Sequence, residues 1–413
     1  MFFKFSSILT ILTLTIFWTS INAVIVVDAN CQHDNVTVAI NSLNVHLLQQ
    51  ISRQDSVSNQ FYSPTSISIA FAILTAGSAK LTRSQLLVVL HLKDIDAVNI
   101  QYGRLISDLN TKKDLPTNET YEISLANRVL IEKTFKVNAT YRDRIVAKQF
   151  HSTIQDVDFV NNGQQIVDNL NQWVSNETRG LIGKVFNEPL PTTTKLVIAN
   201  AIYFKGIWTS PFNVNQTKNG TFNGLQRTNN QVPFMYRKGQ YRTLNIDSLK
   251  AMAIEVPYVG NASMVILLPN VNTTLSSMIN NLTKLSFNQT IESLLKKQPL
   301  TIELYLPKFN LTTEYNLVQI FKALNVSDVF DPSKSDLSRI APGGNLFVSA
   351  AIHRAVVQVD EEGTEAAAVT AIGVGTTSIP PPPPVVRVNR PFAFVILDKV
   401  TGLQLFTGQV VQL

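Results

Sequence analysis

Hydrophobic and polar positions follow different periods in the two halves of this 413-residue chain. In the first half, residues 66–76 are apolar enough for a buried helix, and residues 83–92 have the spacing of a short amphipathic helix. Residues 165–174 repeat their apolar positions at helical spacing, and Gly180 beyond them fits a helix stop. These patterns predict helices in the first half.

Strand-like runs follow in the second half. β-branched and aromatic residues bounded by turn residues predict strands at 195–204, 252–259, 263–269, 300–309 and 355–360. The last stretch, 391–411, predicts a hairpin of two buried strands that turns near Asp398 and Gly402. Helices followed by strands predict an α+β fold with largely antiparallel sheets.

One segment fits neither period. Residues 360–384 read DEEGTEAAAVTAIGVGTTSIPPPPP, in which alanines favour helix while Thr364, Val369 and Gly373 oppose it. The five prolines at 380–384 favour an extended polyproline II conformation. A flexible linker before a rigid spacer is one interpretation, but strand-like runs on both sides argue against it.

The N-terminus has the features of an export signal. Lys4 precedes an apolar run from about residue 8 to residue 18, and the small Ala23 that follows suits cleavage. The run is too short for a comfortable membrane span, so we interpret residues 1–23 as a secretory signal peptide rather than a membrane anchor. The sequence therefore predicts a secreted, extracellular protein.

Asparagine sequons agree with export. An asparagine-rich chain contains some N-x-S/T triplets by chance, so we predict a glycosylated surface without assigning a glycan to any one site. The twelve candidates are Asn35, Asn118, Asn138, Asn176, Asn215, Asn219, Asn261, Asn272, Asn281, Asn288, Asn310 and Asn325.

Length and cysteine content limit how the chain is stabilised. A chain of 413 residues is longer than one hydrophobic core usually serves, which by itself suggests two domains. Cys31 is the only cysteine, so no internal disulfide can form and packing alone must hold the fold. This thiol could pair with another molecule, but an inert cysteine in an N-terminal tail is the simpler interpretation.

The charge balance is mildly basic. The net charge of +6 falls to +5 when Lys4 leaves with the signal peptide, an excess that would attract an anionic polysaccharide or membrane surface only weakly. Lys93, Arg104, Lys112 and Lys113 lie near one another without forming a dense run. A solvated helix face is favoured over a dedicated polyanion site, and nothing resembles a nucleic-acid module.

Signals for catalysis are absent. The sequence contains no G-x-S-x-G, H-E-x-x-H, P-loop or dinucleotide motif, and the five histidines His33, His46, His91, His151 and His353 lack metal-ligand spacing. His353, beside the acidic patch, could act as a general base, but a structural histidine is favoured because no nucleophile motif accompanies it. We expect no enzyme activity, metal or cofactor.

Four segments carry a resemblance to a known family. They are FYSPTSISIAFAILTAGSA at 61–79, LVIANAIYFKGIWTSPF at 196–212, VSAAIHRAVVQVDEEGTEAAAVT at 348–370 and NRPFAFVILDKVTGLQLFTGQVV at 389–411. In this order and at these separations they resemble the serpin family of protease inhibitors.

The resemblance replaces the two-domain estimate. It implies a single serpin domain at 38–413, built from three mainly antiparallel β-sheets and about nine helices, with an N-terminal segment at 24–37 before it. The featureless segment then resembles an exposed reactive-centre loop at about 361–386. In the family, a protease cleaves this loop and forms an acyl-enzyme. The loop then inserts as a new strand of the largest sheet and distorts the trapped protease.

The composition of the hinge fits insertion. Side chains alternate faces along a strand, and the face predicted to enter the interior is small and uncharged. The resemblance implies a hinge of Glu361, Gly363, Thr364, Ala366, Ala368 and Thr370. We therefore predict an inhibitory serpin acting as a monomer on serine proteases through a covalent acyl complex. The alternatives are inhibition of a cysteine protease by the same chemistry, and a non-inhibitory carrier or chaperone.

The resemblance also nominates a scissile bond. Counting about seventeen residues from Glu361 reaches Thr377–Ser378. Residues 361–384 contain no Arg or Lys, so a trypsin-like target is disfavoured and an elastase-like or chymotrypsin-like one is favoured. A shift of register would nominate a neighbouring small residue and the same class of enzyme.

Other positions match structural residues of the family. Ser63, Ser66, Asn200 and His353 match a hydrogen-bond network beneath the opening sheet, the region called the shutter. Lys308 and Glu361 match a salt bridge at the top of the sheet, the breach, and Trp208 matches a tryptophan packed nearby. An ordinary surface lysine remains the alternative for Lys308.

Overall fold

The computed structural model describes residues 34–113, 121–227, 229–362 and 381–413. The predicted signal peptide, His33, Cys31, Asn118, the hinge from Gly363 onward and the predicted Thr377–Ser378 bond lie outside the described residues.

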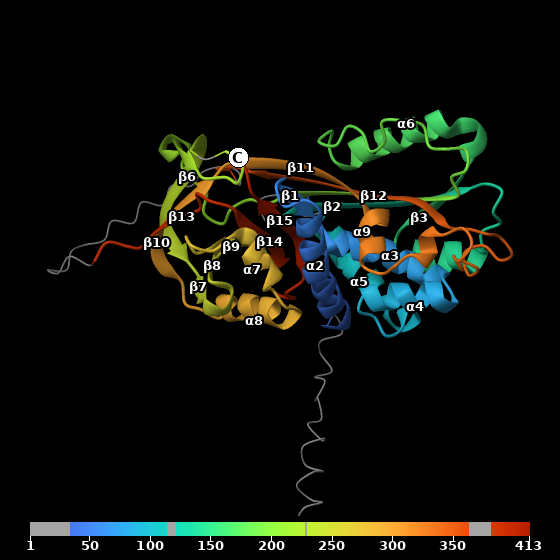
Figure 1. The fold of residues 1–413 in the computed structure, drawn as a ribbon, viewed down its shortest axis with the longest axis horizontal. Helices are drawn as coiled ribbons and strands as arrows, with labels where there is room; N and C mark the ends of the chain where they lie inside the picture. Colours follow the sequence, from blue (N-terminus) through green and yellow to red (C-terminus); the bar gives the residue numbers. More distant parts are fainter. Residues whose placement is uncertain (1–33, 114–120, 228, 363–380) are drawn as a thin grey trace, which may run out of the picture.

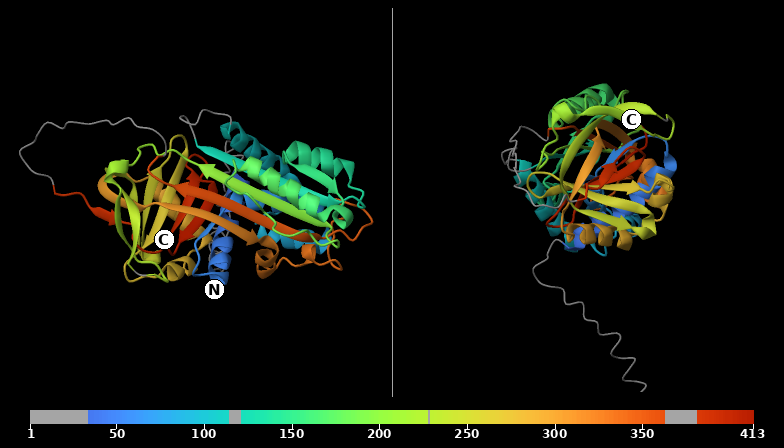
Figure 2. Two further views of the ribbon diagram at one scale, coloured as in Figure 1. Left: turned by 90° about the horizontal axis from the view of Figure 1, so that it is seen from above. Right: turned by 90° about the vertical axis from the view of Figure 1, so that its left-hand side faces the viewer.

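The central sheet is the largest by strand length. It has five strands in the order β11 (Phe309–Asn316), β12 (Val348–Val359), β4 (Leu196–Lys205), β2 (Glu122–Glu132) and β3 (Thr153–Val157). The pairs β11–β12 and β2–β4 are antiparallel, whereas β12–β4 and β2–β3 are parallel. Seen from above, these strands run along the long axis of the molecule (Figure 2).

Two smaller sheets lie at one end of the central sheet (Figure 1). The six-stranded sheet is antiparallel throughout and has the order β1 (Gln60–Tyr62), β15 (Gln404–Val410), β14 (Phe392–Asp398), β9 (Ala262–Pro269), β8 (Ala251–Pro257) and β7 (Thr243–Ile246). The four-stranded sheet has the order β13 (Val385–Arg387), β10 (Leu300–Pro307), β6 (Asn230–Tyr241) and β5 (Lys218–Phe222), with β13 parallel to β10.

Helices cover both faces of the central sheet. In Figure 1, α6 lies on one face, while α3, α4, α5 and α9 lie on the other. The α-helices are α2 (Asp34–Gln54), α3 (Pro64–Gly77), α4 (Lys80–Val89), α5 (Ile95–Lys113), α6 (Phe159–Glu177), α7 (Leu275–Asn280), α8 (Lys284–Leu295) and α9 (Leu317–Ala323). In addition, η1 (Thr140–Gln149) is a π-helix, and η2 (Val214–Gln216), η3 (Asp247–Leu249) and η4 (Asp328–Phe330) are short 3₁₀ helices. The α+β fold of three mainly antiparallel sheets is confirmed.

Helix α3 confirms the prediction at 66–76 and shows why the chain forms a helix there. The hydroxyl of Ser63 accepts the backbone N–H of Ser66 at 3.1 Å, and Pro64 occupies the first turn, where its missing N–H costs nothing. All fourteen residues of the helix are buried. A helix that is apolar on every side belongs in a core, which is where α3 lies.

Several boundaries differ from prediction. Helix α4 ends at Val89, before the predicted 92, because His91 takes a left-handed backbone with φ of 56°. The predicted strand at 300–309 is wrong as a single element. Lys308 separates β10 from β11, and these two strands pair in different sheets. The predicted helix at 165–174 lies inside the longer α6.

One cluster of buried side chains joins the three sheets. It includes Ile198 of the central sheet, Ile266 of the six-stranded sheet and Leu304 of the four-stranded sheet. Among the described residues, no helix combines the length and apolar character needed to cross a bilayer.

Candidate functional site

The seam between β12 and β4 is the central feature of the site. These strands run parallel and side by side, with His353 of β12 directly opposite Asn200 of β4. β12 ends at Val359, immediately before the segment predicted to be the reactive-centre loop. We call this junction the β12–β4 seam.

A buried polar cluster lies at the seam. The backbone N–H of Ser63 donates to Nε2 of His353 at 3.1 Å, and Nδ1 of His353 bonds to Oδ1 of Asn200. The side-chain amide of Asn200 also donates to Oγ of Ser66 at 2.5 Å and to Oδ1 of Asn127. The structure thus brings together the four residues expected to form a network, two from the sheet and two from the start of α3.

The histidine in this cluster is neutral. Complete burial lowers the pKa of His353 from 6.5 to about 3, since a charged ring would lose its hydration. Nε2 accepts from Ser63, so Nδ1 carries the proton that is donated to Asn200. Both ring nitrogens are engaged, which agrees with the structural interpretation of His353 and not with a general base.

Glu361 is anchored at the top of the seam. Nζ of Lys308 lies 2.5 Å from Oε2 of Glu361, and the hydroxyl of Thr217 donates to Oε1 at 2.6 Å. The backbone N–H of Phe212 donates to the Glu361 carbonyl at 3.2 Å. Burial opposes ionisation of this carboxyl, but the bonds from Lys308 and Thr217 leave the pKa of Glu361 below its ordinary value. The expected contact between Lys308 and Glu361 is present.

Trp208 holds the neighbouring residue. Its indole N–H donates to the Asp360 carbonyl at 2.8 Å, and its ring stacks on Tyr258 with 4.2 Å between centroids. Where the chain leaves the central sheet it is therefore held by a half-buried ion pair and a buried indole.

The segment that begins at residue 381 is anchored in the four-stranded sheet. The backbone N–H of Glu303 donates to the Pro384 carbonyl at 2.9 Å, and the N–H of Val388 donates to the Tyr305 carbonyl at 2.9 Å. These bonds flank β13, which lies parallel to β10. The predicted loop is thus tied to the central sheet at one end and to the four-stranded sheet at the other.

Two contributors to the site were not expected from the sequence. Asn127 lies directly opposite Asn200 on β2, a strand that was not predicted, and Thr217 bonds to Glu361 from a turn. Five of the eleven residues at 122–132 are polar or charged, so no sequence signal singled out Asn127. No signal marks Thr217 either, because its role depends on the tertiary position of Glu361.

The sequon asparagines are mostly exposed. Asn288 is half-buried, and the side chain of Asn35 is not described. The exposed ones are Asn138, Asn176, Asn215, Asn219, Asn261, Asn272, Asn281, Asn310 and Asn325. Among the described residues, no group of three or more metal-ligating side chains comes together.

The fold and this seam define a serpin-type protein, and comparison with known families agrees. The family model described as Serpin (serine protease inhibitor) matches residues 38–413. The chain therefore belongs to the serpin family, whose members are in general protease inhibitors and not catalysts.

Two relatives carry the likeness over most of their length. The chain is 34% identical to Iripin-8 of Ixodes ricinus over 383 residues, which covers 90% of this chain and 92% of that protein. It is 32% identical to a leukocyte elastase inhibitor of Xenopus laevis over 379 residues, covering 91% and 99% of the two chains.

A solved structure extends the comparison to a ligand-binding serpin. Human thyroxine-binding globulin, in complex with its hormone, superposes with a TM-score of 0.79 at 25% identity and covers 92% of this chain and 99% of that one. Similarity to both an inhibitor and a carrier means that membership of the family does not by itself assign inhibition.

Proposed function

We propose that this chain is a secreted, monomeric inhibitor that traps a serine protease by suicide cleavage of its reactive-centre loop at 361–386. The protease would attack the Thr377–Ser378 bond, and the acyl-enzyme would be trapped when the freed loop enters the β12–β4 seam. The target would be elastase-like or chymotrypsin-like.

The parallel pairing of β12 with β4 carries the proposal. A segment that follows β12 and folds back along it runs antiparallel to β12, and therefore antiparallel to β4 as well. Insertion would replace one parallel pair with two antiparallel pairs, which are slightly more stable per residue.

The polar cluster supports an opening of the seam. His353 and Asn200 face each other across it, so their bond must break when a strand enters. Buried polar groups need partners, and an incoming backbone offers new donors and acceptors to both. The contacts of Glu361 with Lys308 and Thr217 would hold the first residue of the loop in place until cleavage.

The choice of target rests on the residues around the bait. Thr377 is small, and the absence of Arg and Lys from residues 361–384 disfavours trypsin-like enzymes. The likeness to a leukocyte elastase inhibitor points to the same class of target. If no serine protease is trapped, the alternative target is a cysteine protease, which uses the same acyl chemistry.

Incubation of the mature protein with elastase-, chymotrypsin- and trypsin-like proteases tests the mechanism. We expect a covalent complex that survives a denaturing gel, together with a released C-terminal peptide that begins at Ser378. Another peptide start would correct the register and keep the mechanism. Cleavage without any complex, and without a rise in thermal stability, would favour the carrier function instead.

A matched pair of variants tests insertion directly. Thr364→Arg would place a charge on the face predicted to enter the interior, so we expect the protease to cleave the loop and escape. Glu365→Arg puts the same charge on the opposite face and should retain complex formation. Equal loss of complex in both variants would contradict the predicted register of insertion.

Export and surface binding are separate parts of the proposal. Secretion predicts a mature chain beginning near residue 24 and a fall in mass on treatment with an N-glycosidase.

Lys93 and Arg104 are exposed but sparse, so binding to an anionic polysaccharide should be weak and lost at moderate salt.

A further inference from the structure

A pocket of about 620 Å³ lies on the four-stranded sheet, and its lining includes Gln216 and Lys218, the chain neighbours of Thr217. Its volume falls in the range of roughly 300–1,000 Å³ that small-molecule sites occupy. Residues of β5, β6 and β10 line it together with Arg387 of β13. All four strands of the sheet therefore contribute to one concave surface.

Aromatic rings form the floor of the pocket. Tyr236, Tyr305 and Arg387 stand directly opposite one another on three adjacent strands, so their side chains share one face. The rings of Tyr236 and Tyr305 are 4.9 Å apart, and the guanidinium of Arg387 lies 3.8 Å above the Tyr305 ring. Phe234 extends the floor, and a side chain at Gly220 would meet its ring at 2.9 Å. The surface suits a flat apolar ligand.

The charges of the lining are positive. Lys218 and Arg387 line the pocket, no carboxylate does, and neither cation has an ion-pair partner among the described residues. Stacking on Tyr305 uses the face of the Arg387 guanidinium and leaves its in-plane N–H groups able to bind an anion. Glu303 lies two residues before Tyr305 and therefore on the same face of β10, and its partner across β6 is Lys238.

We propose that this pocket binds a small planar aromatic carboxylate. The ring system would stack on Tyr236, whose ring is tilted by 45° from that of Tyr305, and the carboxylate would bind Arg387 and Lys218. The pocket volume suits a small ligand, and the aromatic floor suits a planar ring. The two cations, which have no ion-pair partner among the described residues, suit a carboxylate. The inference concerns binding alone and does not depend on whether the chain inhibits proteases.

The site is also placed to respond to the loop. Arg387 belongs to β13, the strand that ties the far end of the predicted loop to β10. A ligand held jointly by Arg387 and by β5 and β6 would fasten β13 to the rest of the sheet. Ligand binding should therefore raise the temperature of unfolding by linkage.

Calorimetry with naphthalene-2-carboxylate tests the proposal, with naphthalene-2-carboxamide as its neutral counterpart. We expect a Kd for the carboxylate of about 10 µM to 1 mM, typical of so small a ligand, and at least about tenfold weaker binding of the carboxamide. Arg387→Gln should weaken carboxylate binding about tenfold or more, as expected for loss of a charge-assisted bond. Lys322→Gln, at an exposed lysine of α9 outside this sheet, should leave binding unchanged.

Glycans at the rim are controlled in the same experiment, because Asn215 and Asn219 also border the pocket. The titration is run on the glycosylated protein and on enzymatically deglycosylated protein. The site is supported if either form binds the carboxylate and if Arg387→Gln weakens that binding while Lys322→Gln does not. The proposal is overturned if neither form binds below about 5 mM, or if the two variants behave alike while both unfold at the wild-type temperature.

Discussion

His353 shows how strongly a buried side chain depends on its partners. The backbone N–H of Ser63 and the side-chain oxygen of Asn200 satisfy a neutral ring, whereas burial disfavours a charged one. The unfolded chain, in contrast, binds a proton at this ring below about pH 6.5. Lowering the pH should therefore destabilise the native state through His353.

The first prediction concerns pH. Since the folded pKa of His353 is about 3, its effect on stability is absent above pH 6.5 and grows as pH falls toward 3. We expect a loss of about 2 kcal/mol in the free energy of unfolding at pH 5 relative to pH 7.5 from this group. Denaturant unfolding of wild type and His353→Gln measures it. The variant should be less stable at pH 7.5 and less sensitive to acid, and equal pH dependence would contradict the argument.

The ion pair of Lys308 with Glu361 gives a second residue-scale prediction. Glu361 is only 4% exposed, so Lys308→Met leaves a buried carboxylate and should cost about 1–3 kcal/mol in unfolding free energy. Because the folded pKa of Glu361 is lowered, this stabilisation is present above about pH 4.5 and disappears as pH falls through the folded value.

A double-variant cycle isolates that pair. Lys308→Met, Glu361→Gln and the double variant should give a coupling energy of about 0.5–3 kcal/mol at pH 7. A coupling energy near zero would mean that Thr217 alone holds the carboxylate. The same cycle repeated at decreasing pH should show the coupling energy shrink as the carboxyl of Glu361 becomes protonated.

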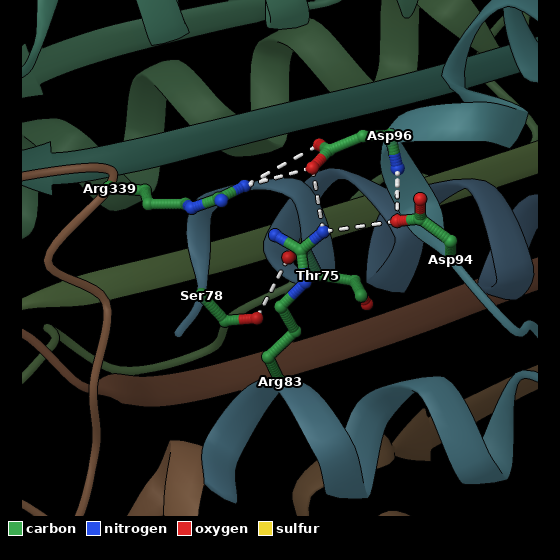
Figure 3. Close-up of polar contacts among 6 residues, drawn as sticks. All are labelled: Thr75, Ser78, Arg83, Asp94, Asp96 and Arg339. Atoms are coloured by element: carbon green, nitrogen blue, oxygen red, sulfur yellow. Dashed lines mark hydrogen bonds and ion pairs between the residues drawn. The ribbon is translucent and has the colours of Figure 1, made fainter. Parts of the chain in front are cut away.

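At the scale of elements, a charged cluster joins the consecutive helices α4 and α5 to a segment far away in the sequence (Figure 3). Arg83 of α4 lies 2.8 Å from Asp96 in the first turn of α5 and 3.3 Å from Asp94. Arg339, from the segment between η4 and β12, lies 3.2 Å from the same Asp96. The negative charge at the start of α5 also suits the dipole of that helix.

The cluster predicts a modest, salt-dependent stabilisation. The Asp96 side chain is 53% exposed, so solvent screens its bonds and Asp96→Asn should cost only about 0.5–1 kcal/mol. Unfolding measured at about 0.05 M and 1 M NaCl should show the difference between wild type and variant shrinking at high salt. Asp168→Asn on α6, remote from this cluster, serves as the control, and a difference that salt leaves unchanged would point to packing instead of charge.

The whole molecule is arranged around the five-stranded central sheet, which the predicted loop would extend to six strands. Native packing leaves β12 and β4 paired in parallel, and the three sheets share one core, so opening the seam involves the packing of α3 beneath it. The same residues would form an exposed loop before cleavage and a strand of the central sheet after cleavage.

The corresponding prediction concerns thermal stability. Cleavage anywhere near the C-terminal end of the loop by a protease that is not trapped should raise the unfolding temperature by about 10 °C or more, because the sheet gains two antiparallel pairings. Scanning calorimetry before and after limited proteolysis measures the change. The Thr364→Arg variant should show a much smaller rise, and an unchanged temperature in cleaved wild type would contradict insertion.

Local patterns determined much of this protein. The apolar run at 66–76, the strand runs at 195–204 and 263–269, and the C-terminal hairpin were predicted from the sequence because their periods are local properties. Sequence reasoning also placed Ser63, Ser66, Asn200 and His353 in one network, through their match to a family.

Tertiary structure alone decided the rest. Which strands share a sheet depends on contacts between residues distant in sequence, so the chain at 300–309 divides between two sheets at a lysine that no periodicity marks. Thr217 and Asn127 join the site only because the fold brings them to Glu361 and Asn200. The aromatic pocket likewise exists only where four strands meet, since none of its residues forms a motif in the chain.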